Sequence, residues 1–172
     1  MTACRSICLY TPSTDPSGMG AHMVDLIAEF AGTADVALMN RWPTSEFNDF
    51  GPVPADWTLD TAIGRAVVIR NADDAIIGRV SWHRVHYGPN PESAAWNIGI
   101  ELRAEARGRG CGSEAQRLLA QHLLATTPLH RVEAVTDVDN AAELRALTTA
   151  GFRREGILRG AQFRASRWRD VV

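Results

Sequence analysis

The sequence predicts a mixed α+β domain built on one sheet, and three observations indicate this class. First, strand-like apolar runs follow one another at 66–70, 75–82 and 94–102, with short turn-forming segments between them, which is typical of an antiparallel meander. Second, residues 113–125 carry apolar side chains at helical spacing with polar ones between. Third, a strand and a helix follow at 131–136 and 140–150, which favours a βαβ-like second half.

The length of 172 residues fits one domain. Residues 1–20 are rich in Pro, Ser and Gly and show little periodicity, so we expect an irregular N-terminal extension followed by a single domain over 21–172. Upstream of the meander we further expect a strand at 24–30, helices at 34–42 and 57–63, and a loop at 43–56 with room for one helical turn.

The last elements are predicted from caps and turns. Asn140 is suited to cap the start of the helix at 140–150, and Gly151 suits the position after its end. A closing hairpin is expected from strands at 152–158 and 162–172 around Arg159-Gly160-Ala161.

Composition excludes several classes of protein. No apolar run approaches the roughly 18 residues of a membrane span, and the N-terminus lacks the pattern of a secretory signal. Three cysteines are too few for a disulfide framework, so a reducing, cytoplasmic location is expected. Cys4 and Cys8 have no downstream partners at metal-ligand spacing, so we expect no metal site.

Charge is distributed unevenly along the chain. Residues 1–100 hold 6 Arg against 11 acidic residues, whereas residues 101–172 hold 12 Arg against 9. A cationic second half suits an anionic ligand, and an acidic first half suits a cationic one, although ordinary solvated surface explains the charges equally well. The Arg excess is local and not interleaved with aromatic residues, so we expect no nucleic-acid partner and no membrane partner.

Residues 105–114 form the segment with the clearest chemistry. Glycines alternate at 108, 110 and 112, directly after a predicted strand and before a predicted helix, with Arg107 and Arg109 between them. Backbone N–H groups of such a loop converge on one point, and the helix start adds partial positive charge, so the segment suits a pyrophosphate. A tight strand-to-helix turn is the alternative. The spacing matches neither a Walker loop nor the Rossmann fingerprint.

Arg107-x-x-Gly110-x-Gly112 resembles the acyl-coenzyme A loop of the GNAT N-acetyltransferases. The segment AAWNIGIELRAEARGRGCGSEAQRLL is similar to the fourth strand, loop and third helix of the branch that acetylates ribosomal-protein N-termini. HRVEAVTDVDNAAELRALTTAGFRREGILR is similar to the next strand, helix and strand, including its Asp-x-x-Asn and Gly-Phe marks. The resemblance covers 66–172 well and 23–65 loosely.

This resemblance implies a GNAT fold: a mostly antiparallel sheet of six to seven strands, splayed between strands 4 and 5 and flanked by about four helices. It implies acetyl-coenzyme A as cosubstrate, lying in the splay like an added strand. The residues expected to bind it are Ile100, Leu102 and Arg103 at the pantetheine arm, Arg107, Gly108, Arg109, Gly110, Cys111, Gly112 and Ser113 at the pyrophosphate, and Asn140 at the end of the arm.

The expected acid–base residues depart from the family pattern. Asn97 stands where this branch often has a Glu base, and Glu143 stands where it often has Ser. Glu101 shares a strand face with Asn97, so the catalytic candidates are Glu101, Glu143 and Asn97. Alternatives are His83 or His86, expected in the loop before the strand at 94–102, or catalysis by proximity without a dedicated base.

A covalent role for Cys111 is the less favoured interpretation, because a small residue in a tight turn explains it. For function we expect an N-acetyltransferase that moves the acetyl group to a primary amine, on a protein N-terminus or a small molecule, by direct attack in a ternary complex. The alternative is a non-catalytic acyl-coenzyme A-binding or regulatory module. The chain ends at Val172, within the expected last strand, so either the sequence is cut short there or the strand is completed otherwise, as by the partner chain of a homodimer.

Overall fold

The computed structural model describes four segments of the chain, residues 7–9, 45–52, 64–70 and 75–172. Within the loop expected at 43–56, the 3-10 helix η1 (Glu46–Asn48) forms the expected single turn. The strand predicted at 24–30 and the helices predicted at 34–42 and 57–63 lie outside the described residues.

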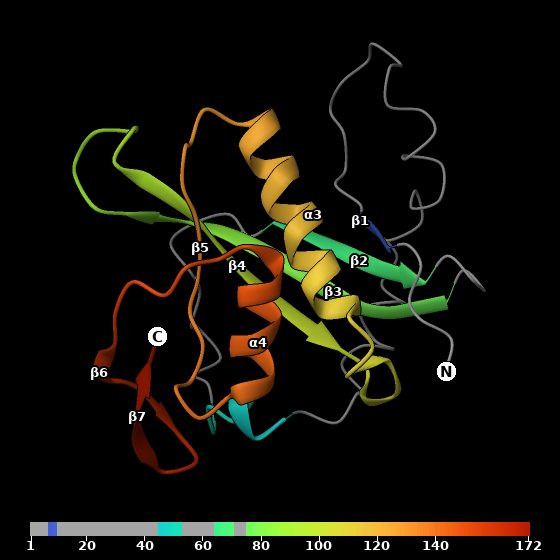
Figure 1. The fold of residues 1–172 in the computed structure, drawn as a ribbon. Coiled ribbons are helices and arrows are strands. Elements are labelled where there is room, and N and C mark those ends of the chain that lie inside the picture. The colour runs from blue at the N-terminus through green and yellow to red at the C-terminus, as the bar shows by residue number, and fades with distance from the viewer. Residues whose placement is uncertain (1–6, 10–44, 53–63, 71–74) are drawn as a thin grey trace.

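The main sheet has five strands in the order β1-β2-β3-β4-β5 (Figure 1). Strands β2, β3 and β4 pair antiparallel in sequence order, which confirms the predicted meander. Strand β5 pairs parallel to β4 after a crossover through helix α3. The strands are β1 (Ile7–Leu9), β2 (Gly64–Arg70), β3 (Ala75–His86), β4 (Ala94–Leu102) and β5 (Val132–Ala134).

Strand β1 was not predicted. It pairs antiparallel with β2, placing Ile7 opposite Arg70, although it lies within the segment expected to be irregular. That expectation is wrong for these three residues, because their strand depends on a partner some sixty positions away and not on a local pattern. The division into an extension and one domain stays a prediction.

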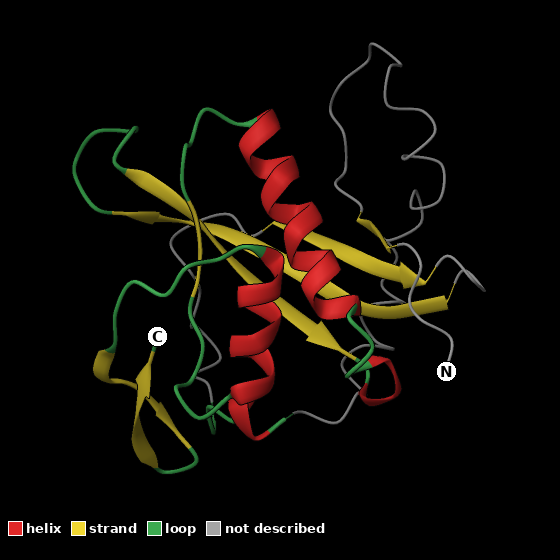
Figure 2. Cartoon of the chain, viewed as in Figure 1, coloured by secondary structure: helices red, strands yellow, loops and turns green. Residues whose placement is uncertain are grey.

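Helices α3 (Cys111–Thr126) and α4 (Ala141–Ala150) lie on the same face of the sheet (Figures 1 and 2). Ala115, Leu119 and Leu123 recur at intervals of four along α3 and are at most 2% exposed. They pack against buried side chains of the sheet such as Val80 and Ile98 to form the core. No helix in the described part of the chain is long and apolar enough to cross a membrane.

The caps of α4 fall where the sequence predicts them. The side-chain oxygen of Asn140 accepts a hydrogen bond from the backbone N–H of Glu143 at 3.2 Å. Gly151 ends the helix at φ +99°, and its N–H bonds back to the carbonyls of Leu147 and Thr148. The helix therefore has the predicted bounds to within one residue.

The closing hairpin differs from its prediction. Strands β6 (Leu158–Arg164) and β7 (Arg167–Val171) turn at Ala165 and Ser166, whose φ angles are +46° and +59°, and not at residues 159–161. Positive φ at both central residues matches the twist of a two-residue hairpin. Gly160 instead marks an irregularity inside β6, where the pairing register shifts.

This hairpin is a separate two-stranded sheet that joins the chain after β5. Thr136 and Val172 exchange two backbone hydrogen bonds of 3.0 and 2.8 Å. Beneath it, Arg164 forms a fully buried ion pair with Asp137, each side chain being 1% exposed. The described residues thus hold five strands in one sheet and two in another, with two α-helices, against the six to seven strands and four helices expected.

Candidate active site

Strands β4 and β5 separate partway along their length. They pair only from Trp96 to Ile98, opposite Val132 to Ala134, while β4 runs on to Leu102 without a β5 partner. This is the splay that the resemblance implies. It leaves the β4 edge from Gly99 to Leu102 unpaired on the β5 side.

The open edge presents the backbone of Ile100 and Leu102. The Arg103 N–H bonds to the Ile77 carbonyl of β3 at 2.9 Å, and the Trp96 N–H bonds to the Arg131 carbonyl on the other side at 3.0 Å. Bonding in an antiparallel strand alternates between its two edges, so even-numbered residues of β4 direct their N–H and C=O groups away from β3. Ile100 and Leu102 therefore face the splay as expected, whereas the Arg103 N–H is engaged on β3.

The glycine-rich loop continues from this edge into α3. Gly108 and Gly110 adopt φ of +69° and +82°, and a Cβ at either position would touch nothing within 4 Å. Gly110 precedes the helix without a side-chain cap, so the first N–H groups of α3 point into the loop. Gly112 lies over the side chains of Leu102 and Ile100, which seats the helix start on β4.

The arginines in and beside the loop differ in the contacts that their side chains make. Arg107 donates through Nε to the Leu102 carbonyl at 3.0 Å, which ties the loop to the end of β4. Arg103 pairs with Glu105 at 2.7 Å, while Arg109 is exposed. Cys111 is 2% exposed and belongs to the core, which fits the packing interpretation and not a covalent role.

The three predicted catalytic residues do not come together. Asn97 and Glu101 lie on the face of β4 opposite buried Ile98 and partly buried Ile100, which pack into the core, and therefore opposite α3 and α4. Glu101 forms an ion pair with Arg79 at 2.5 Å, and its side chain is 15% exposed. Glu143 belongs to α4, which covers the other face of the sheet.

Glu143 nevertheless has an unusual environment. Burial raises the pKa of its carboxyl group. Gln116 is 1% exposed, and its Nε2 forms no hydrogen bond with any described residue. The contact between α3 and α4 therefore buries the polar side chains of Gln116 and Glu143 with few hydrogen bonds to offset their loss of hydration.

The two histidines considered as bases lie on β3 and not in a loop. The strand runs to His86, four residues beyond its predicted end, because the hairpin with β4 continues past the core. His83 is the cross-strand partner of Asn97, so the two side chains share a face. The prediction of a loop at these positions is wrong, but it is the strand that places His83 beside Asn97.

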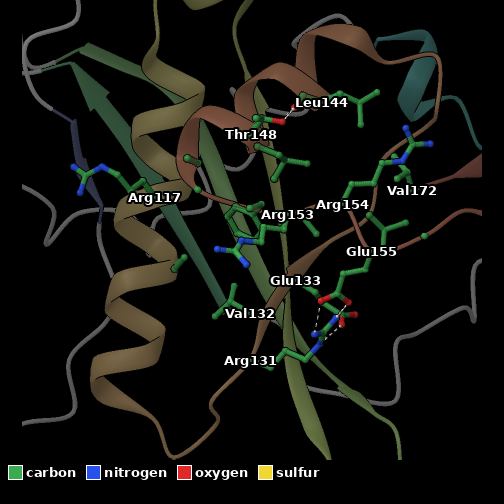
Figure 3. A pocket seen from close by; sticks show the side chains of 18 of the residues that line it. Arg117, Arg131, Val132, Glu133, Leu144, Thr148, Arg153, Arg154, Glu155 and Val172 are labelled. Carbon is green, nitrogen blue, oxygen red and sulfur yellow. Dashed lines mark hydrogen bonds and ion pairs between the residues drawn. The ribbon is translucent and has the colours of Figure 1, made fainter.

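Sequence reasoning missed a cluster around Glu133. This carboxylate accepts hydrogen bonds from Asn97 Nδ2 at 3.3 Å, from the Tyr87 hydroxyl at 2.6 Å and from Arg131 Nε at 3.3 Å. Arg131 also pairs with Glu155, with contacts of 3.0 and 2.5 Å (Figure 3). The hydrogen bond from the Tyr87 hydroxyl to Glu133 raises the pKa of the phenol.

A groove of about 730 Å³ lies beside β5, between it, α3, α4 and the segment that follows α4 (Figure 3). Tyr87, Arg131 and Glu133 line one part of it, and Arg153 and Glu155 another. None of the predicted site residues lines this groove. It is therefore distinct from the splay and the glycine-rich loop.

An unpaired strand edge that leads into a glycine-rich helix start is the arrangement that the resemblance implies for an acyl-coenzyme A-dependent acyltransferase. The chain belongs to the GNAT acetyltransferase family, since residues 20–153 match the family model described as an acetyltransferase (GNAT) domain.

Known proteins agree with this assignment. The chain is 25% identical over 167 residues to the uncharacterized N-acetyltransferase p20 of Bacillus licheniformis, covering 95% of this chain and 92% of that protein. It resembles the crystal structure of ribosomal-protein-S5-alanine acetyltransferase from Vibrio fischeri, with TM-score 0.55 and 25% identity over 63% of this chain and 58% of the other. Spermidine N-acetyltransferase from Vibrio cholerae, in complex with CoA and spermine, shares the fold at TM-score 0.55, 24% identity and coverage of 64% and 62%. The chain thus spans about three fifths of these solved chains.

Proposed function

We propose that this enzyme transfers the acetyl group of acetyl-coenzyme A to a primary amine, on a protein N-terminus or a small molecule, by direct attack in a ternary complex. The observation that carries the proposal is the continuous path from the open β4 edge at Ile100 and Leu102 into the glycine-rich start of α3. One end of this path suits an extended amide-containing arm, and the other suits a pyrophosphate.

The residues of the path fit the cosubstrate. A pantetheine arm carries amide groups that pair with a strand edge, which the outward-facing backbone of Ile100 and the Leu102 N–H supply, while the Leu102 carbonyl accepts from Arg107. The positive φ angles of Gly108 and Gly110 and the open space around them let backbone N–H groups approach a phosphate closely. The start of α3 adds its dipole. Asn140, whose Oδ1 caps α4, retains its Nδ2 donor for the arm.

When bound, acetyl-coenzyme A supplies the thioester whose acyl carbon the amine attacks. An arm that follows the β4 edge from Leu102 ends where the strands rejoin at Ile98 and Ala134. Asn97 lies one residue from this junction, on the face away from α3 and α4. We therefore place the acceptor amine on that face.

Among the described residues near Asn97, we infer that His83 offers the route for the proton of the amine. The Glu101 carboxylate is held in an ion pair with Arg79, and Glu143 lies on α4, on the opposite face of the sheet. His83, the cross-strand neighbour of Asn97, accepts the proton directly or through water, while alignment of the amine with the acyl carbon supplies much of the acceleration.

The names of two similar solved structures support the two kinds of acceptor: one is named for a ribosomal-protein alanine and the other for spermidine, a small amine. The test is calorimetric titration with acetyl-coenzyme A, followed by thiol-release assays on N-terminal peptides and on polyamines. We expect binding together with release of free coenzyme A for at least one amine. Binding without release would indicate the non-catalytic module, and no binding would contradict both.

A further inference from the structure

Asn97 and Glu133 face each other across the junction of the splayed strands. They are register partners on β4 and β5, and the pairing ends one residue later, at Ile98 and Ala134. One residue of strand is about 3.3 Å, so their side chains lie within reach of the point where an arm following β4 would end.

The chemistry of this pair fixes the orientation of the Asn97 amide. The contact joins Asn97 Nδ2 to Glu133 Oε1 at 3.3 Å. A carboxylate only accepts hydrogen bonds, so Asn97 must turn its NH₂ group towards Glu133. The two polar atoms of a carboxamide diverge, and Asn97 Oδ1 is therefore turned away from Glu133, free to accept a hydrogen bond.

Glu133 is itself held firmly. Its other oxygen, Oε2, accepts from the Tyr87 hydroxyl at 2.6 Å and from Arg131 at 3.3 Å, and its side chain is 11% exposed. Arg131 is anchored in turn by Glu155 (Figure 3). Because the guanidinium has donors only, it requires an oxygen on its side of Glu133, which leaves Oε1 for Asn97.

We propose that Glu133 is a positioning residue: it orients the Asn97 amide so that Asn97 Oδ1 accepts an N–H of the acceptor amine and aims the nitrogen lone pair at the acyl carbon. This inference rests on the proposed acetyl transfer. It explains how a chain with Asn at position 97 orders an amine without a carboxylate at that position, since the Glu101 carboxylate of the same strand pairs with Arg79.

Glu133→Gln is the informative substitution. Arg131 would draw the Gln oxygen, so the Gln NH₂ would face Asn97 and force its amide to turn over. Asn97 would then present a donor to the amine, and we expect kcat to fall about tenfold, the equivalent of one hydrogen bond. Glu133→Asp keeps an acceptor-only group and should retain most of the activity.

The experiment is a double-mutant cycle on the full chain, with kcat measured for Glu133→Gln in the wild-type and Asn97→Ala backgrounds. The amine is the one that the wild type acetylates fastest in the panel above. We expect the tenfold loss in the first background and less than about twofold in the second, with an unchanged Kd for acetyl-coenzyme A in both. Glu155→Gln is the matched control, since it weakens the other ion pair of Arg131 without touching Asn97, and its loss of kcat should be much smaller than that of Glu133→Gln.

Equal losses of kcat in both backgrounds would overturn the inference, because Glu133 would then act independently of Asn97. An unchanged kcat in both would also overturn it and leave Glu133 a structural role. A wild type that binds acetyl-coenzyme A but acetylates no amine would instead refute the proposed function, and this inference with it.

Discussion

The left-handed glycine at the start of α3 provides a graded test of the phosphate site. Gly110 has φ +82°, and a Cβ there would meet nothing within 4 Å. An L-residue in this region of backbone space costs about 1–2 kcal/mol. Since no neighbour holds the position, the loop in a Gly110→Ala variant should relax in the free enzyme, and binding must then restore the strained conformation.

The backbone strain in Gly110→Ala should weaken the binding of acetyl-coenzyme A. Because 1.4 kcal/mol is a tenfold change in Kd, the strain corresponds to a loss of about five- to thirtyfold. The free energy of unfolding should change little. The assay is calorimetric titration of both proteins with acetyl-coenzyme A, alongside urea denaturation.

Gly151→Ala is the matched control. Gly151 also has positive φ, at +99°, and equally open surroundings, but it ends α4 and not the loop. Because its N–H bonds to the carbonyls of Leu147 and Thr148, the folded helix end keeps this conformation, so the substitution should lower the free energy of unfolding by about 1–2 kcal/mol and leave the Kd unchanged. A Gly110→Ala variant with wild-type affinity, or equal losses of affinity in both variants, would refute the placement of the pyrophosphate.

The remaining predictions concern stability. Arg164→Met should lower the free energy of unfolding by about 3–5 kcal/mol, because it leaves Asp137 buried and unpaired, whereas Glu105→Gln at an exposed pair should change it by less than about 0.5 kcal/mol in the same urea titration. Leu119→Ala, at 0% exposure in the core, should cost about 2–5 kcal/mol in that assay. Asp137 also makes the free energy of unfolding depend on pH. Burial opposes its charge, but hydrogen bonds from the Asp139 backbone and Arg164 outweigh burial and lower the pKa of its carboxyl group. The stability that Asp137 contributes is therefore present above its unfolded pKa near 3.8 and is lost as the pH falls through its folded pKa. Glu143 has the opposite sign, since burial raises its pKa, so Glu143→Gln should raise the free energy of unfolding at neutral pH and not in acid.

Each stability prediction has a contradicting result. A loss below about 1 kcal/mol in Arg164→Met would mean that the buried pair adds little. The same small loss in Leu119→Ala would mean that α3 is not packed as described. A pH profile of unfolding that Asp137→Asn leaves unchanged below pH 4 would contradict the assigned shift, as would a Glu143→Gln variant that is destabilised at neutral pH.

The parts of the fold that the sequence predicted are those governed by local patterns. The apolar spacing of α3 and the caps of α4 each depend on residues within a few positions of one another. The β2–β3–β4 meander follows from short connections. In the hairpin, neither Ala165 nor Ser166 is a Gly, Asn or Asp that favours positive φ, whereas Gly160 is, so the turn predicted at 159–161 is wrong.

In the candidate site, too, the sequence predicted the features that depend on neighbouring residues and missed those that depend on distant ones. The backbone groups of the β4 edge and the glycine loop are contiguous in sequence, and the structure brings them together as expected. Glu133 was missed because its partners Asn97 and Tyr87 are 36 and 46 positions away. Strand alternation alone could not reveal that Glu101 is committed to Arg79.

The position of acetyl-coenzyme A along the open edge of β4 can be seen in a crystal structure of the enzyme with coenzyme A bound. We expect hydrogen bonds of about 3 Å between the pantetheine amides and the backbone of Ile100, with the pyrophosphate at the Gly108–Gly112 loop. A cofactor seated elsewhere, such as in the groove beside Arg131 and Arg153, would contradict it.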